Sequence, residues 1–319
     1  MARELLLLRH GKSDWGAGLE DFYRPLKDRG KRGAQRIGVW LAQQEVIPDL
    51  VISSPAERAL VTAQKTLKAM GGDDHGIKQD KRIYAADVDD LLAVLGECQQ
   101  KSARVMLVGH NPGLEELLLW LAGETVSLPE DGKLMPTATL ARLQLQADWP
   151  LLQAGCARLL SITRPDTLPK KFPYPAPDGK EQRDRPAYYY TQSSVIPYRV
   201  RDGNTEILVV ASSKKKHLVI PKGIQEPGLS PQASAAKEAL EEAGVEGEVA
   251  DAAIGSYCYE KWGATCSVSV YPMKVTRMVA DAEWEERHRG RQWLGLKKAA
   301  RLLKQRQLAP LLKKLEASL

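Results

Sequence analysis

A stretch rich in proline and lysine divides this chain into two parts. Between residues 164 and 186 it contains six prolines, three lysines (Lys170, Lys171 and Lys180) and no apolar periodicity. Each proline fixes its own backbone and removes a hydrogen-bond donor, so the stretch does not suit a helix interior or a central strand. We therefore predict a domain at 1–168, a linker at 169–186 and a second domain at 187–319. With 319 residues in total, each domain is long enough to bury its own core.

In the first domain, short apolar runs alternate with helical patterns. Strands are predicted at 4–8, 50–53, 105–108 and 139–145, and helices at 30–44, 55–70, 89–99 and 113–121. This alternation predicts an α/β fold with a mostly parallel sheet flanked by helices.

The second domain has several strand-like runs around one strong helix. The strand-like runs are 192–199, 206–211, 218–220 and 266–275, the helix is 230–243, and further helical segments follow residue 294. This order favours an α+β fold with a mixed sheet.

The charge balance indicates an anionic partner. The net charge is +6 and the pI is near 9.0. No aromatic and basic stacking motif accompanies this charge, and the basic residues after 296 alternate with leucines as in amphipathic helices, so we expect no nucleic-acid partner.

The four cysteines form no C-x-x-C pair, which is typical of reduced, buried thiols. The apolar run 5–8 is too short for a signal peptide or a membrane span, and we expect a cytoplasmic protein with no membrane partner.

Histidines and arginines follow three predicted strands of the first domain. Arg9 and His10 follow the first strand, Arg58 lies in the first turn of the helix after the second, and His110 follows the third. Such strand ends meet at one binding crevice. Arginine forks match phosphate oxygens, and a neutral imidazole attacks phosphorus to form a covalent intermediate. Arg24 is a weaker candidate for the same pocket, and a surface position before a turn is the alternative for it.

The motifs R-H-G (9–11), S-S-P-x-x-R-A (53–59) and G-H (109–110) together resemble the histidine phosphatase superfamily. The segments R-P-L (24–26) and K-L-M-P-T-A-T-L (133–140) are similar to its small phosphohistidine phosphatase branch, SixA. The resemblance implies that His10 is the nucleophile and that Arg9, Arg58 and His110 bind the phosphoryl group. It also implies a site that uses no cofactor.

The acid that would protonate the leaving group is not obvious. Many members of the superfamily supply a carboxylic acid, but the corresponding region here, 83–89, reads I-Y-A-A-D-V-D. Asp87 or Asp89 could serve, and Asp89 is also the residue we expect to cap the next helix. The lack of an obvious acid favours a phosphoramidate such as the phosphohistidine of a protein partner, with a phosphate monoester as the alternative.

Three glutamates share one face of the predicted helix 230–243. Glu238, Glu241 and Glu242 lie at i, i+3 and i+4, and Gly244 ends the helix. Like charges on one face repel one another unless they are well solvated or a cation lies among them. The pattern therefore predicts either a solvated acidic face or a site for a hard cation such as Mg²⁺.

The segment 223–245 resembles the Nudix signature G-x5-E-x7-R-E-U-x-E-E-x-G-U, in which U is apolar. Leu229 and Lys237 replace the first glutamate and the arginine, which commonly pair in the family. The resemblance implies a site for Mg²⁺ (or Mn²⁺). In it Glu238 and Glu242 are ligands, Glu241 is a ligand or the water-activating base, and Gly223 is a backbone contact.

The sequences around 207–223 and 284–300 resemble the diphosphoinositol polyphosphate and diadenosine polyphosphate hydrolases. This implies a multiply phosphorylated, anionic small-molecule substrate. The side chains expected to contact it are Ser212, Ser213, Lys214, Lys222, Arg289 and Arg291, for which solvated loop positions are the alternative.

The whole chain is therefore predicted to be a bifunctional hydrolase of phosphorus-containing bonds. The alternative is that the second domain binds a nucleotide or polyphosphate without cleaving it and regulates the phosphatase. The oligomeric state is left open.

Overall fold

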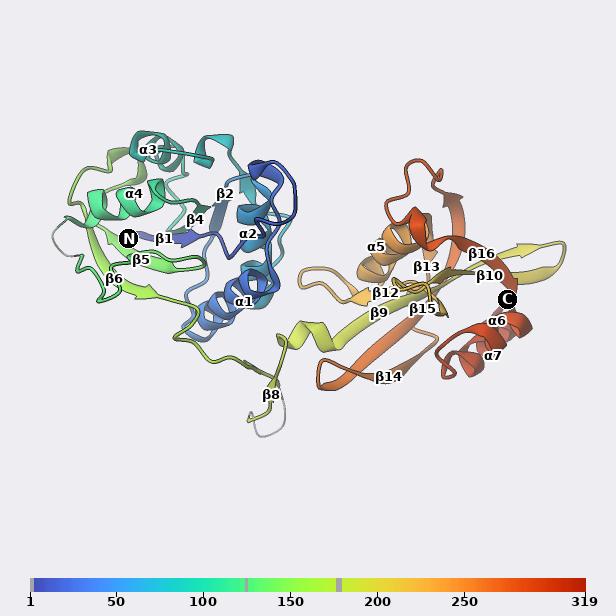
Figure 1. Ribbon diagram of the computed structural model, residues 1–319. Helices are drawn as coiled ribbons and strands as arrows, with labels where there is room; N and C mark the ends of the chain where they lie inside the picture. The colour runs from blue at the N-terminus through green and yellow to red at the C-terminus, as the bar shows by residue number, and fades with distance from the viewer. Residues whose placement is uncertain (1–2, 124–125, 176–179) are drawn as a thin grey trace. The chain divides into compact units, whose positions relative to one another are not determined.

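A computed structural model describes residues 3–123, 126–175 and 180–319 (Figure 1). The chain divides into two compact units, Met1–Phe172 and Pro173–Leu319. Within the predicted linker, β7 (Phe172–Pro173) pairs with β8 (Gln182–Arg183), and residues 176–179, including Pro177, lie outside the described ranges.

The first unit is built on a six-stranded sheet with the spatial order β3-β2-β4-β1-β5-β6. Its strands are β1 (Arg3–Arg9), β2 (Leu50–Ser53), β3 (Lys78–Gln79), β4 (Arg104–Gly109), β5 (Leu140–Leu145) and β6 (Ala157–Thr163). The strands β3, β2, β4 and β1 run parallel, whereas β5 and β6 form an antiparallel edge. The residues that follow β1, β2 and β4 therefore meet at one edge of the sheet.

Helices cover both faces of this sheet (Figure 1). They are α1 (Asp28–Gln43), α2 (Glu57–Met70), α3 (Val88–Gly96) and α4 (Gly113–Ala122). Side chains of β1 alternate between the faces. Leu6 and Leu8 pack with α1 and α2, whereas Leu5 and Leu7 pack with α3 and α4. A strand buried on both faces needs a continuous apolar run, which is the pattern read from the sequence. The predicted α/β fold is confirmed.

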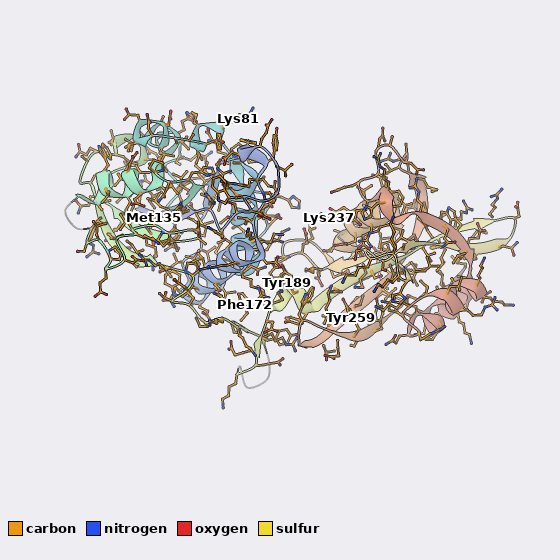
Figure 2. All side chains as sticks on the ribbon, in the orientation of Figure 1. Lys81, Met135, Phe172, Tyr189, Lys237 and Tyr259 are labelled. Carbon is orange, nitrogen blue, oxygen red and sulfur yellow. The ribbon has the colours of Figure 1, made fainter. Side chains whose placement is uncertain are left out.

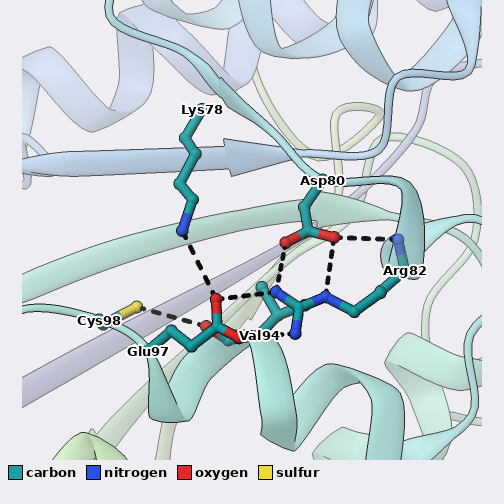
Figure 3. A network of polar contacts seen from close by, with 6 residues as sticks. All are labelled: Lys78, Asp80, Arg82, Val94, Glu97 and Cys98. Carbon is teal, nitrogen blue, oxygen red and sulfur yellow. Dashed lines mark hydrogen bonds and ion pairs between the residues drawn. The ribbon is translucent and has the colours of Figure 1, made fainter.

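A surface network of ion pairs fixes the turn before α3 (Figure 3). Arg82 donates to Asp80 Oδ2 at 2.6 Å and to Glu97 Oε1 at 2.7 Å, and Lys78 Nζ lies 3.9 Å from Glu97 Oε2. Exposed pairs of this kind contribute only about 1 kcal/mol or less each. Their effect here is to hold the backbone that leads into Tyr84.

The second unit contains a mixed eight-stranded sheet. Its strands are β9 (Thr191–Arg201), β10 (Asn204–Ala211), β11 (Leu218–Val219), β12 (Lys222–Ile224), β13 (Val245–Val249), β14 (Gly255–Lys261), β15 (Ala264–Met278) and β16 (Arg291–Gly295). The central strands β9 and β15 are parallel, and the other pairs are antiparallel. The predicted mixed sheet is confirmed.

Helices pack on both sides of this second sheet as well. The helix α5 (Pro231–Ala243) lays Ala235, Ala239 and Ala243 against one face, and these small residues bring its axis close to the strands. The helices α6 (Leu296–Leu302) and α7 (Leu308–Ser318) pack on the other face, where they bury Leu296, Leu308, Leu311, Leu312 and Leu315. Among the described helices, none has the length and apolar character needed to cross a membrane.

Candidate active sites

His10 lies at the carboxyl end of β1, where it is 8% exposed, and its ring centroid is 5.1 Å from that of His110. Its Nδ1 is 2.8 Å from the carbonyl oxygen of Gly11. A carbonyl only accepts hydrogen bonds, so Nδ1 carries the proton and Nε2 keeps its lone pair. Burial lowers the pKa of His10 to about 4, so the ring is neutral near pH 7. These features suit a nucleophile that attacks through Nε2.

His110 follows β4 and completes the pair of buried imidazoles. Its Nε2 is 2.9 Å from Ser54 Oγ at the end of β2, and burial lowers its pKa to about 3. Its Nδ1 has no hydrogen-bond partner among the described residues. The ring therefore has one polar atom that is buried and unsatisfied in this part of the chain.

Three arginines converge near the two histidines. Arg58 begins α2 and is 5% exposed, Arg24 is 6% exposed, and Arg9 donates to the carbonyl oxygen of Met135 at 2.6 Å. The Nε atom of each is buried and finds no acceptor in the described part of the chain, and the same holds for Arg24 Nη1. Buried guanidinium donors without acceptors are costly unless an anion binds there. The structure thus brings Arg24 to the same pocket as the other predicted residues.

Asp21 also lies in this pocket, although no sequence motif pointed to it. Its carboxylate accepts from Arg58 Nη2 at 2.7 Å and from the Tyr84 hydroxyl at 2.9 Å, and Arg24 Nη2 lies 3.0 Å from Oδ1. Burial acts to raise the pKa of Asp21, but the hydrogen bond from Tyr84 and the charge of Arg58 outweigh it and lower that pKa. An ionised carboxylate therefore engages two of the arginines expected to bind phosphate.

The expectation that Asp89 caps α3 is wrong. Asp87 is the cap: its Oδ1 accepts from the backbone N–H of Asp90 at 2.9 Å, and its own N–H donates to Asp90 Oδ2 at 3.4 Å. The reciprocal pair places the cap two residues earlier because Asp90 supplies the returning side chain. Asp87 is thus engaged in the helix start, and Asp89 lies exposed in the first turn.

In the second unit, α5 presents the three predicted glutamates on one face, as expected from their spacing. Burial raises the pKa of Glu238 to about 8, and the neighbouring Glu242 and Glu241 add to the effect. Burial also raises the pKa values of Glu241 and Glu242. A Cβ atom at Gly223 would collide with the Glu238 carboxylate, so a larger residue there would displace that side chain. Three carboxylates of raised pKa on one helix face are oxygen donors of the kind that a hard divalent cation takes.

Glu242 is held by one cation and a backbone donor. Arg289 donates to its Oε1 at 2.9 Å, and the N–H of Lys222 donates to its Oε2 at 3.0 Å. The Lys222 ammonium donates to the Tyr259 hydroxyl at 2.9 Å and to Gln192 Oε1 at 3.2 Å, and burial lowers its pKa. The structure therefore brings Arg289 and Lys222 together with the carboxylates, as predicted for phosphate-binding cations.

The carboxylates do not yet form a compact ligand set. Among the described residues, the group with three ligand atoms within 4.8 Å of one another is Asp73, Asp74 and His75, a partly exposed turn of the first unit. The contacts of Glu242 with Arg289 and Lys222 explain part of this spread, because they hold one carboxylate to other partners.

Lys237 has a partner that the sequence did not reveal. Lys237 lies on α5 (Figure 2). Its Nζ donates to Glu226 Oε2 at 2.9 Å and lies 3.9 Å from Glu241 Oε1. Leu229 removes the glutamate of the signature, yet Glu226, three residues earlier, supplies a carboxylate. An ion pair between this loop and α5 is thus present at a shifted position.

The remaining predicted contacts lie apart from the carboxylates or are engaged elsewhere. Arg291 donates to the carbonyl oxygens of Ala243 and Gly244 at the end of α5. Ser212 Oγ accepts from two backbone N–H groups of its own loop, where Ser213 and Lys214 are exposed. The Arg291 guanidinium thus caps the C-terminal carbonyl groups of α5, a place where a cation is favoured.

Comparisons with known proteins agree with this division. Residues 5–92 match the model of the histidine phosphatase superfamily (branch 1), and residues 191–315 match the NUDIX domain. The chain therefore carries a histidine phosphatase domain followed by a Nudix domain. Both domains are of hydrolase families acting on phosphorus-containing bonds, so the chain is an enzyme. Nudix domains generally use divalent metal ions such as Mg²⁺.

Individual relatives cover one half of the chain at a time. An uncharacterized chloroplastic protein of Arabidopsis thaliana is 28% identical over 141 residues, which is 40% of this chain and 63% of that protein. Nudix hydrolase 12, mitochondrial, of the same plant is 31% identical over 145 residues, 38% of this chain and 70% of that protein. The solved structure of the protein histidine phosphatase SixA complexed with tungstate is 22% identical, covers 51% of this chain and 98% of that chain, and has a TM-score of 0.44.

Proposed function

We propose that the phosphatase domain hydrolyses a phosphohistidine protein, or a phosphate monoester, through a covalent intermediate on His10. The observation that carries the proposal is the neutral imidazole, with Nδ1–H bound to Gly11 and Nε2 free, beside arginines with unused donors. Nε2 forms a bond to phosphorus while the bond from phosphorus to the leaving group breaks. Water then attacks phosphorus, the N–P bond breaks, and phosphate leaves with the imidazole restored.

The surroundings of His10 favour a leaving group that needs little acid assistance. Asp87 is engaged in a helix cap, and Asp21 is an ionised carboxylate of lowered pKa, which makes it a poor proton donor. The nitrogen of a phosphoramidate is protonated more easily than an alkoxide oxygen. This supports phosphohistidine ahead of a simple monoester.

For the Nudix domain we propose hydrolysis of a diphosphate linkage in a polyphosphorylated small molecule. Candidates are inositol pyrophosphates, dinucleoside polyphosphates and nucleoside polyphosphates. A bound Mg²⁺ or Mn²⁺ would neutralise phosphate charge in the transition state. Glu238 and Glu242 would hold it, Glu241 would be a further ligand or accept a proton from water, and Lys222 and Arg289 would bind phosphate oxygens.

The test is one substrate panel applied to three proteins, with and without Mg²⁺. The panel contains a phosphohistidine peptide, p-nitrophenyl phosphate, an inositol pyrophosphate, a dinucleoside polyphosphate and a nucleoside triphosphate. We expect His10→Ala to abolish the metal-independent activity alone and Glu242→Gln to reduce the Mg²⁺-dependent activity alone, by about a hundredfold or more. Loss of both activities in either variant would contradict two independent sites.

The alternative for the Nudix domain is a non-catalytic polyphosphate-binding module. The same panel separates the two, because a binding module gives no Mg²⁺-dependent turnover of any member. The intact glutamates on α5 and the Lys237–Glu226 ion pair favour catalysis.

A further inference from the structure

A cavity of about 520 Å³ lies in the first unit beside the start of α1. Its walls come from the loop after His10, from the first half of α1, from the loop 136–138 before β5 and from the segment 165–170 after β6. The volume is in the range of small-molecule sites, roughly 300–1,000 Å³. Arg9, His10, Arg58 and His110 do not line it, so it is separate from the pocket described above.

The lining of this cavity is strongly cationic. Arg29, Arg32 and Arg36 lie at i, i+3 and i+7 on α1 and thus on one face of the helix. Lys12 and Lys170 add two more charges, and Asp28 and Asp166 are the acidic residues of the lining. Five cations against two carboxylates leave a net charge of +3 in a space that holds one small molecule.

These arginines lack the partners that usually balance such charge. Within the described ranges, no carboxylate lies within 4.0 Å of a nitrogen of any of the three. Arg36 Nη1 reaches the carbonyl oxygen of Pro165 at 3.3 Å, and its Nε is buried with no acceptor among the described residues. Burial, followed by repulsion from Arg32 and Arg29, lowers the pKa of Arg36. Arg29 is exposed and Arg32 and Arg36 are partly buried, so solvent screens their mutual repulsion only in part, and an anion bound among them would relieve it.

We propose that this cavity binds a small molecule carrying two or more phosphate groups, at a site distinct from both catalytic centres. A net charge of +3 matches a multiply charged anion better than a single phosphate. The concave shape fits a small molecule, whereas a nucleic acid or an acidic protein surface would need an extended basic face. Arginine forks are the side chains best suited to bind several phosphate oxygens at once.

The cavity also contacts the backbone around the nucleophile. Ala138, in its wall, donates its N–H to the carbonyl oxygen of His10 at 3.0 Å, and Lys12 is two residues from His10. A bound anion would thus rest against the loop that holds the catalytic histidine.

The experiment is a calorimetric titration of the full chain with pyrophosphate and with tripolyphosphate, in EDTA to suppress metal-dependent binding. The test variant is Arg29→Ala/Arg32→Ala, because neither side chain hydrogen-bonds to another described residue. The matched control, Lys101→Ala/Arg158→Ala, removes the same charge from exposed positions outside the cavity. A third protein, Arg58→Ala, removes binding at the catalytic pocket.

We expect the test variant to bind pyrophosphate at least about tenfold more weakly, which is about 1.4 kcal/mol. The control should bind as wild type does, and Arg58→Ala should retain the binding event. Unchanged turnover of p-nitrophenyl phosphate by the test variant shows that it is folded. Wild-type binding by the test variant, an equal loss in the control, or complete loss in Arg58→Ala would each overturn the proposal.

Discussion

The candidate phosphatase site surrounds a neutral imidazole with arginines, whereas the Nudix domain places three carboxylates on one face of a helix. In the first, Asp21 supplies one carboxylate to Arg58 and Arg24, but the buried Nε atoms of Arg9, Arg24 and Arg58 have no acceptor among the described residues. In the second, burial raises the pKa values of Glu238, Glu241 and Glu242, repulsion from the other two adds to the effect at Glu238, and Arg289 pairs with Glu242. The difference teaches that the two sites call for ligands of opposite charge, an anion among the arginines and a cation among the glutamates.

Chelation should give the largest contrast between the two sites. With EDTA we expect the Nudix activity to fall by about a thousandfold, because phosphate charge is no longer neutralised. The phosphatase activity should stay within about twofold, since its charges come from arginines. The measurement is turnover of each substrate before and after EDTA, with restoration by excess Mg²⁺ as the control. A parallel fall of both activities would contradict the expectation that only the Nudix domain depends on a metal ion.

The next prediction concerns the two buried imidazoles. The pKa of His10 is lowered from 6.5 to about 4 and that of His110 to about 3. Between these values and 6.5 the unfolded chain binds more protons than the folded one. Their contribution to stability is therefore present above pH 6.5 and is lost as the pH falls toward 4.

NMR titration of the ring protons checks this directly, with signals assigned by their absence in His10→Ala and His110→Ala. We expect both signals to show the neutral form at pH 5.5. Titration of either near 6.5 would contradict the buried, uncharged pair.

Asp21→Asn tests whether the Asp21 carboxylate competes with the substrate for Arg58 and Arg24. Removing the charge frees Arg58 and Arg24 for the substrate, so we expect KM for p-nitrophenyl phosphate to fall by about threefold to tenfold with little change in kcat. The control is Asp14→Asn, since Asp14 pairs with Lys27 outside the pocket. A rise in KM would instead mean that Asp21 helps to orient the arginines.

The smallest effect should come from the ion pair that ties α5 to the preceding loop. The pair of Lys237 and Glu226 is partly exposed, so Glu226→Gln should cost about 0.5–1 kcal/mol in the free energy of unfolding. Lys237→Arg is the matched variant that keeps the charge. A double-mutant cycle with Lys237→Met measures the coupling, and a value near zero would show that the pair does not stabilise this loop.

Much of the fold followed from periodicity. The run at Leu5–Leu8 predicted a strand buried on both faces, and the helix ending at Gly244 was placed by its glycine and its apolar spacing. The short strands β3, β12 and β16 were not predicted, because two to five residues carry too little pattern and form only when a neighbouring strand is present.

The candidate sites were predicted unevenly for the same reason. His10, Arg58 and His110 stand at strand ends, and parallel strands bring such residues together. Asp21 begins a three-residue 3₁₀ helix (Asp21–Tyr23) that carries no motif, so no sequence signal could place it against Arg58. Arg291 was expected to contact the phosphates of the substrate. It donates instead to a carbonyl oxygen at the C-terminal end of α5, a contact that only the folded arrangement brings about.

The sequence by itself determined the two domain families, the α/β layers, the proposed nucleophile and the glutamate face, because these depend on local spacing along strands and helices. The tertiary structure alone decided which charges meet: Asp21 with two arginines, Lys237 with Glu226, and, around one cavity, three arginines that have no carboxylate partner in the described ranges. Charge interactions act over a few ångströms in space, whatever the separation in sequence. For that reason the chemistry class could be predicted from the chain, and the balance of charge in each site could not.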